Sequence, residues 1–231
     1  MKKHIIALTG YAGVGKDTIA DLLVAHLGFR KVAFADALRA EVADGFGVEI
    51  LHLAHPSTKN HPISALALRR APRELLAAIA LSGIEIPRNG SGQPADEWLD
   101  QPRAPRQILQ WWGTEYRRAT HSHYWARLLL KRLANYIRDG EKRFVITDCR
   151  FRNEADTVRF LGGHIWKVTR PGINSTTTSE GSHVSATDGS EFMPDVILAN
   201  SHDVRHLQQL VLSEFLSTET GIAGASVTVP A

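Results

Sequence analysis

Residues 4–28 decide the fold, and they read HIIALTGYAGVGKDTIADLLVAHLG. The apolar run at residues 4–9 predicts a short buried strand, and the apolar positions of residues 19–27 share one face of a predicted helix that ends at Gly28. Between them, residues 10–16 have the glycine and lysine spacing G-x-x-x-x-G-K. A strand, a loop of this spacing and a helix in succession predict a phosphate-binding loop.

The chemistry of such a loop follows from its residue types. Glycines let consecutive backbone N–H groups surround phosphate oxygens, and the positive end of the following helix dipole adds attraction. Lys16 contributes a positive charge for the β- and γ-phosphates and is a candidate catalytic residue. The residues that we expect to bind ATP here are Ala12, Gly13, Val14, Gly15, Lys16, Asp17 and Thr18.

The position after the lysine departs from the common pattern, because Asp17 stands where a serine or threonine is usual and a hydroxyl follows only at Thr18. A carboxylate beside a triphosphate repels it unless the carboxylate points away or meets a magnesium ion (Mg²⁺). Either Asp17 or Thr18 is therefore a candidate Mg²⁺ ligand. The departure favours small-molecule and nucleotide kinases over switch GTPases.

The rest of the chain alternates predicted strands with predicted helices. This pattern predicts a three-layer α/β fold, in which helices flank a five-stranded parallel sheet. Prolines punctuate residues 45–103, which we expect to form a helical and loop insert. Residues 1–219 are expected to form a single domain and residues 220–231 a flexible tail. The further strands are expected at residues 31–35, 143–147, 164–169 and 196–199, and helices at 37–43, 101–119, 121–138 and 204–216.

Composition excludes several classes of protein. Of the 231 residues 43% are hydrophobic and 22% charged, which is typical of a soluble globular protein rather than a disordered chain. No apolar run reaches the length of a membrane helix, and the single cysteine, Cys149, favours a reducing compartment, so we expect a cytoplasmic protein. The net charge is only +3, without a basic stripe, so nucleic acid is not an expected partner. The oligomeric state, including a homodimer, stays open.

A second group of candidates follows the predicted strand at residues 143–147. Asp148 stands at the end of that strand, where ligand-binding residues of parallel sheets gather, and Arg150 and Glu154 come soon after. Asp148 is able to hold Mg²⁺ or orient an attacking group, and Arg150 to clamp a phosphoryl group during transfer. The alternative is that Asp148 caps the helix that follows.

Two further stretches have polar candidates. Arg106 and Gln110 lie one helical turn apart, so they share a face that could meet a base and a phosphate, or simply an exposed face. Arg170 opens a polar stretch at residues 170–190 that is either a closing lid or a solvated loop.

Taken together, these blocks resemble the bacteriophage deoxynucleoside monophosphate kinases, which are P-loop kinases. The blocks stand in the family's order over about residues 4–200, with a poor match at residues 45–103. The resemblance is carried by Gly15-Lys16-Asp17-Thr18, Arg106-Gln107-Ile108-Leu109-Gln110 running into Gly113-Thr114, Tyr124-Trp125, Asp148-Cys149-Arg150 with Glu154, and Arg170-Pro171-Gly172.

The resemblance implies a P-loop kinase fold and transfer of the γ-phosphoryl of ATP to a deoxynucleoside 5′-monophosphate (dNMP), in the host cytoplasm if a phage encodes the protein. It also implies that the insert contributes to monophosphate binding and that Arg170 binds ATP from the lid. The rival hypotheses are a kinase of another phosphorylated small molecule, such as phosphomevalonate or dephospho-coenzyme A, a non-catalytic nucleotide-binding module, and an ATPase acting on nucleic acid. By the family pattern, the monophosphate site is lined by Arg106, Gln110, Gly113, Thr114, Trp125, Asp148, Arg150 and Glu154.

Overall fold

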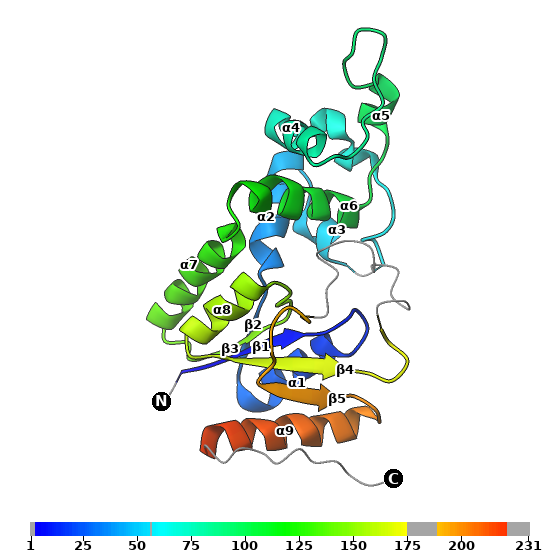
Figure 1. The fold of residues 1–231 in the computed structure, drawn as a ribbon. Helices are drawn as coiled ribbons and strands as arrows, with labels where there is room; N and C mark the ends of the chain where they lie inside the picture. The colour runs from blue at the N-terminus through cyan, green and yellow to red at the C-terminus, as the bar shows by residue number, and fades with distance from the viewer. Residues whose placement is uncertain (1–2, 56, 175–188, 221–231) are drawn as a thin grey trace. The chain divides into compact units, whose positions relative to one another are not determined.

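The computed structural model describes residues 3–55, 57–174 and 189–220 (Figure 1). They divide into two compact units. The first, which we call the sheet unit, consists of Met1–Ala33 and Asn135–Ala231, and the second, the helical unit, consists of Phe34–Ala134. The predicted insert at residues 45–103 lies within the helical unit.

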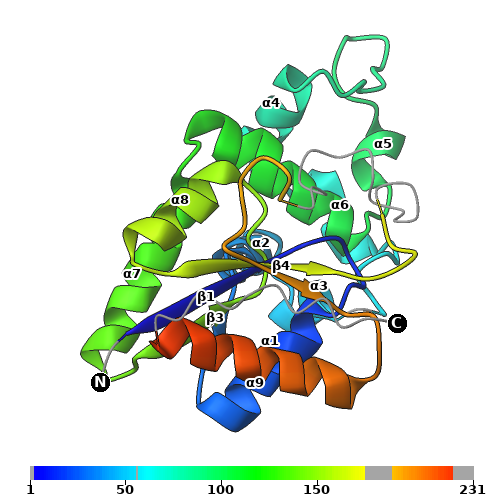
Figure 2. The ribbon, with the colours of Figure 1, turned by 60° about the horizontal axis from the view of Figure 1, so that its bottom comes forward.

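The sheet unit contains a five-stranded sheet in the order β2-β3-β1-β4-β5, and all neighbouring strands are parallel. Helices α1 and α9 lie on one face of this sheet and α8 lies on the other (Figures 1 and 2). The predicted α/β class, with a five-stranded parallel sheet flanked by helices, is therefore confirmed. The elements are β1 (His4–Thr9), α1 (Lys16–Leu27), β2 (Arg30–Val32), β3 (Arg143–Ile146), α8 (Arg152–Phe160), β4 (His164–Thr169), β5 (Val196–Ala199) and α9 (Val204–Thr220).

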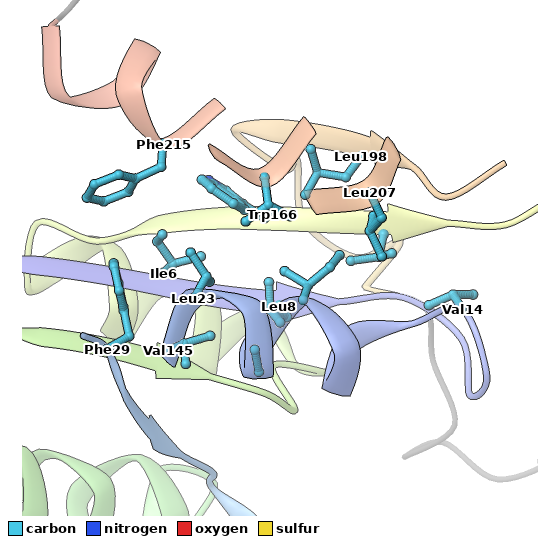
Figure 3. Close-up of a cluster of buried hydrophobic side chains, with 14 residues drawn as sticks. Ile6, Leu8, Val14, Leu23, Phe29, Val145, Trp166, Leu198, Leu207 and Phe215 are labelled. Atoms are coloured by element: carbon cyan, nitrogen blue, oxygen red, sulfur yellow. The ribbon is translucent and has the colours of Figure 1, made fainter. Parts of the chain in front are cut away.

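Buried apolar side chains explain this layering. Alternate residues of a strand point to opposite faces, so Ile6 and Leu8 of β1 face α1 and α9, together with Trp166 and Val168 of β4 (Figure 3). Ile5, on the other face, packs near Val158 of α8. Strands with both faces covered require nearly continuous apolar sequence. This is why apolar runs in the sequence predicted the strands.

Several element boundaries differ from those predicted. Strand β2 spans Arg30–Val32 rather than residues 31–35, because the backbone is already helical at Phe34, and α2 (Ala35–Phe46) begins directly after it. Asp36, whose residue type favours an N-cap position, therefore lies in the first turn of α2, where it pairs with Arg39. At the other end of the chain, α9 includes Thr220, which was predicted to belong to the tail, and residues 221–231 lie outside the described residues.

The helical unit consists of short helices and turns. The predicted helix at residues 101–119 begins only at Pro105, because Arg103 is extended and exchanges backbone hydrogen bonds with Ile63. From Trp111 it continues as a π-helical segment, η3. Besides α2, the elements are α3 (Ile50–Ala54), η1 (Ser64–Leu66), η2 (Leu68–Arg70), α4 (Arg73–Leu81), α5 (Asp96–Asp100), α6 (Pro105–Gln110), η3 (Trp111–Arg118) and α7 (Tyr124–Arg138), whose last four residues belong to the sheet unit.

None of the helices in the described part of the chain combines the length and the apolar character that a membrane span requires.

Candidate functional site

The glycine loop connects the end of β1 to the start of α1, as the sequence predicted. Gly10 and Gly15 both have positive φ angles, of 128° and 106°. A Cβ atom at Gly10 would lie 2.3 Å from the Val168 carbonyl oxygen, and one at Gly15 would lie 2.5 Å from Nδ2 of Asn200. Only glycine satisfies both the backbone angle and the close approach at these two positions.

Lys16, the first residue of α1, lies against this loop. Its Nζ donates hydrogen bonds to the carbonyl oxygens of Gly10 and Tyr11, each at 2.7 Å. The loop therefore bends back over the start of its own helix, with the lysine ammonium held at the bend. The ammonium has the same sign as the backbone N–H groups and the positive end of the helix dipole at the N-terminus of α1. Together they produce a positive potential that attracts an anion.

Asn200 supports the loop from the far end of the sequence, and sequence reasoning missed it. It directly follows β5, and its backbone N–H donates to the Thr169 carbonyl oxygen at 2.8 Å. Its side-chain Nδ2 donates to the Val14 carbonyl oxygen, also at 2.8 Å, and the residue is only 9% exposed. The one available signal was its position directly after a predicted strand, at the edge where parallel sheets collect ligand-binding residues.

The two candidate metal ligands differ in their surroundings. The carboxylate of Asp17 is 83% exposed and pairs with Nζ of Lys31 at 3.2 Å. Thr18 is half-buried, and its hydroxyl makes no hydrogen bond to any residue in the described ranges. In that same part of the chain, no three His, Cys, Asp or Glu side chains gather as a metal site. A metal ion here would have to take most of its ligands from phosphate and water, as Mg²⁺ commonly does.

Asp148 and Arg150 lie at the same edge of the sheet as the glycine loop. Strands β1 and β3 are parallel neighbours, so their carboxyl ends meet, and the loop follows one of them while Asp148 follows the other. The N–H of Cys149 donates to the Leu8 carbonyl oxygen at 3.1 Å, which joins the two segments beyond the strand pairing. The structure thus brings Lys16, Asp148 and Arg150 to one edge of the sheet unit.

Glu154 is almost fully buried, at 3% exposure, and it organises the segment before α8. Its Oε2 accepts hydrogen bonds from the backbone N–H of Arg150 at 2.9 Å and of Phe151 at 3.2 Å. The cap of α8 is thus built by Phe151 and Glu154, so the alternative interpretation of Asp148 as the N-cap is wrong. Glu154, predicted to line the monophosphate site, fixes the backbone that presents Arg150.

Arg170 follows β4, which is the other parallel neighbour of β1, and its side chain is exposed. Its carbonyl oxygen accepts a hydrogen bond from the N–H of Ile173 at 3.1 Å, which closes a tight turn. Most of the predicted lid at residues 170–190 falls on residues 175–188, which lie outside the described residues.

The remaining predicted residues belong to the helical unit. Trp125 is buried and its Nε1 donates to the Gly113 carbonyl oxygen at 3.0 Å, so the structure brings these two together, with Thr114 next in the chain. Arg106 donates from Nε to Oδ1 of Asn60 at 2.8 Å, and Gln110 is half-buried one turn further on.

Comparison with known proteins adds to this geometry. Residues 98–211 match the family model described as deoxynucleotide monophosphate kinase. A curated protein of Acanthamoeba polyphaga mimivirus, whose name as a deoxynucleotide monophosphate kinase is provisional, is 26% identical over 224 residues, which cover 90% of this chain and 94% of that protein.

Two solved structures are similar over most of the chain. Dephospho-CoA kinase from Campylobacter jejuni aligns with a TM-score of 0.46 and 16% identity, covering 96% of this chain and 99% of that one. A sugar kinase from Janibacter sp. HTCC2649 aligns with a TM-score of 0.40 and 15% identity, covering 96% of each chain.

The matched family segment contains the blocks around Arg106, Gly113, Asp148 and Arg170 on which the resemblance was based. The resemblance predicted from the sequence is therefore confirmed: residues 98–211 of this chain are similar to the deoxynucleotide monophosphate kinases, and the similarity to the mimivirus protein covers 90% of the chain.

Proposed function

We propose that this protein transfers the γ-phosphoryl group of ATP to a deoxynucleoside 5′-monophosphate, which gives ADP and a deoxynucleoside diphosphate. The observation that carries the proposal is the family match over residues 98–211, in a chain whose first strand and helix are joined by a glycine loop. Phosphoryl transfer requires alignment of two anionic substrates and neutralisation of the moving charge, without a covalent enzyme intermediate.

The loop from Gly10 to Gly15 fits the triphosphate of ATP. It lies at the N-terminus of α1, and the Nζ of Lys16 is bound to the Gly10 carbonyl oxygen. Its glycines at positions 10 and 15 lack the Cβ atoms that would contact Val168 and Asn200. We assign the Mg²⁺ contact to Thr18 rather than Asp17, because the Asp17 carboxylate is exposed and paired with Lys31. Bound to the phosphates, Mg²⁺ would supply neutralisation of their negative charge.

We assign different roles to the residues of the two units. In the sheet unit, Arg150 would stabilise the phosphoryl group during its transfer, and Asp148 would orient the acceptor. Glu154 holds the backbone of Arg150 in place through a hydrogen bond. Arginines in comparable roles in GTPases accelerate transfer by about 10³ to 10⁵. Recognition of the acceptor nucleotide in the helical unit is assigned to Arg106, Gln110, Gly113, Thr114 and Trp125.

The test is release of ADP from ATP in the presence of Mg²⁺ and each of the four common dNMPs in turn, with the products identified by chromatography. We expect at least one dNMP to stimulate ADP release with formation of its diphosphate. Lys16→Ala should abolish this activity, whereas Lys142→Ala, which removes an exposed lysine of the same unit, should retain it.

The rival hypotheses give different results in the same assay. Stimulation by dephospho-coenzyme A or phosphomevalonate, and by no dNMP, would identify another small-molecule kinase. Stimulation by DNA would identify an ATPase acting on nucleic acid, and ATP binding without any release of ADP would identify a non-catalytic module. Each of these three results contradicts the proposal.

A further inference from the structure

One carboxylate in the helical unit collects three hydrogen bonds from residues distant in sequence. Glu41, on α2, accepts from Nε1 of Trp112 at 2.9 Å, from Nε of Arg117 at 2.8 Å and from the hydroxyl of Tyr124. We call Glu41, Trp112, Arg117 and Tyr124 the Glu41 cluster. Two of the three donors belong to η3 and the third is the first residue of α7.

The same face of α2 also shapes the contact with η3 by packing. Leu38, Glu41 and Gly45 are three and four residues apart, so they lie along one side of the helix. A Cβ atom at Gly113 would lie 3.1 Å from a methyl carbon of Leu38, and one at Gly45 would lie 2.5 Å from the ring of Trp112. The two helices therefore approach closely where each contributes a glycine.

The charges of the cluster are matched. Burial and the hydrogen bond to Glu41 raise the pKa of Tyr124 to about 12, so its hydroxyl remains a donor at neutral pH. Burial lowers the pKa of Arg117, but the hydrogen bond to Glu41, the charge of Glu41 and the two neighbouring tyrosines together raise the pKa overall. The guanidinium also lies over the rings of Tyr116 and Tyr124, at 4.4 and 4.9 Å from their centroids. One carboxylate thus meets one guanidinium and two neutral donors.

The segment that this cluster holds has an unusual backbone. Residues Trp111–Arg118 are π-helical, a conformation that is rare and is often found at functional sites. Gly113 and Thr114, which we assign to acceptor recognition, lie between Trp112 and Arg117, the two residues tied to Glu41. Glu41 therefore holds this segment on both sides of the predicted recognition residues.

We propose that Glu41 is a positioning residue of the acceptor-nucleotide site, which fixes η3 so that Gly113 and Thr114 are held in the geometry that recognises the monophosphate. This inference rests on the proposed function, and it adds a residue outside the family match at residues 98–211. Glu41 acts through η3 and is not assigned a contact with substrate.

The test compares Glu41→Gln with Asp44→Asn, which makes the same carboxylate-to-amide change at an exposed position of the same helix. Two readouts are needed: the steady-state constants for dNMP and ATP, and amide hydrogen exchange of residues 111–118. Loss of a charged acceptor should raise the KM for dNMP about tenfold while the KM for ATP stays unchanged. Exchange in residues 111–118 should accelerate in Glu41→Gln and stay as in the wild type in Asp44→Asn.

A second variant, Tyr124→Phe, removes one donor and keeps the ring, so it should shift both readouts in the same direction by less. The inference is overturned if Glu41→Gln leaves both readouts unchanged, or if it raises the KM for both substrates and accelerates exchange throughout the chain, which is the signature of a general structural role. If the wild-type protein phosphorylates no dNMP, the proposed function fails, and unchanged exchange in residues 111–118 would then separately refute the role of Glu41.

Discussion

The hydrogen bond from Asn200 to Val14 gives a direct test of how the glycine loop is held in shape. Asn200→Ala removes the Nδ2 donor that reaches the Val14 carbonyl oxygen at 2.8 Å. The backbone hydrogen bond from Asn200 to Thr169 does not depend on the side chain, so the end of β5 should stay in place. The variant therefore isolates the support of the loop.

The size of the effect follows from burial. Both residues are buried, at 9% and 1% exposure, so the Val14 carbonyl would lose a partner that water does not readily replace. Leaving a buried acceptor unsatisfied costs about 1–3 kcal/mol of folding free energy. For a chain of this length, each kcal/mol lowers the melting temperature by about 2–4 °C. If the loosened loop also loses about 1.4 kcal/mol of ATP binding, the affinity falls about tenfold.

Asn200→Asp sharpens the test because it has the same shape but places a carboxylate oxygen opposite the Val14 carbonyl. Two acceptors repel each other, and a negative charge beside the loop also opposes the triphosphate. We expect ATP affinity, measured by calorimetry, to fall in the order wild type, Asn200→Ala, Asn200→Asp. Asn135→Ala removes an exposed side-chain hydrogen bond and serves as the control.

Wild-type ATP affinity in both Asn200 variants, with a lowered melting temperature alone, would refute this reasoning. Asn200 would then stabilise the fold without shaping the loop.

Three further predictions concern single residues. Gly15→Ala should lose ATP binding, because φ at Gly15 is 106° and the new Cβ would lie 2.5 Å from the Asn200 amide. Gly140→Ala is the control: φ at Gly140 is 96°, but nothing lies near the new Cβ, so this variant should lose stability and still bind ATP. Calorimetric titration with ATP distinguishes the two variants. Burial raises the pKa of the Cys149 thiol well above its usual range, so at pH 8 iodoacetamide should alkylate the native protein far more slowly than the urea-unfolded protein, as followed by mass spectrometry. The pKa of Tyr124 is raised to about 12, so the stability that its hydroxyl contributes should be complete below about pH 10 and disappear as the pH rises through 12. The free energies of unfolding of the wild type and Tyr124→Phe, measured by denaturant titration, should therefore converge over that pH range.

The strands were the most predictable part of the fold. The predicted ranges for β1, β4 and β5 coincide with the observed His4–Thr9, His164–Thr169 and Val196–Ala199. Strands covered on both faces need apolar runs with polar or turn residues at their ends, so the sequence predicts both the first and the last residue of such a strand. Strand β2 was misjudged because Phe34 and Ala35 continue its apolar run but already belong to the entry into α2.

Local spacing predicted the glycine loop, since all its parts lie within a few residues of each other. Asn200 and Glu41 had no such signal. Asn200 meets Val14 across 186 residues of sequence, and Glu41 meets Trp112 across 71. A lone asparagine or glutamate has no recognisable spacing, and only the folded chain shows what it contacts.

The sequence of the loop alone likewise could not predict which way the Asp17 carboxylate points. Its carboxylate pairs with Lys31, which lies on β2 and which nothing in the motif mentions. In the same way, the sequence indicated Glu154 as a site residue, but its hydrogen bonds to the backbone of Arg150 and Phe151 depend on how the chain turns into α8.

The most direct test of the account follows the phosphoryl group itself. The protein is incubated with ATP labelled at the γ-phosphate and with the preferred dNMP, and the position of the label is then determined. We predict that the label appears as the β-phosphate of the deoxynucleoside diphosphate, in an amount equal to the ADP formed. Label found only in inorganic phosphate, or remaining in ATP, would contradict the account.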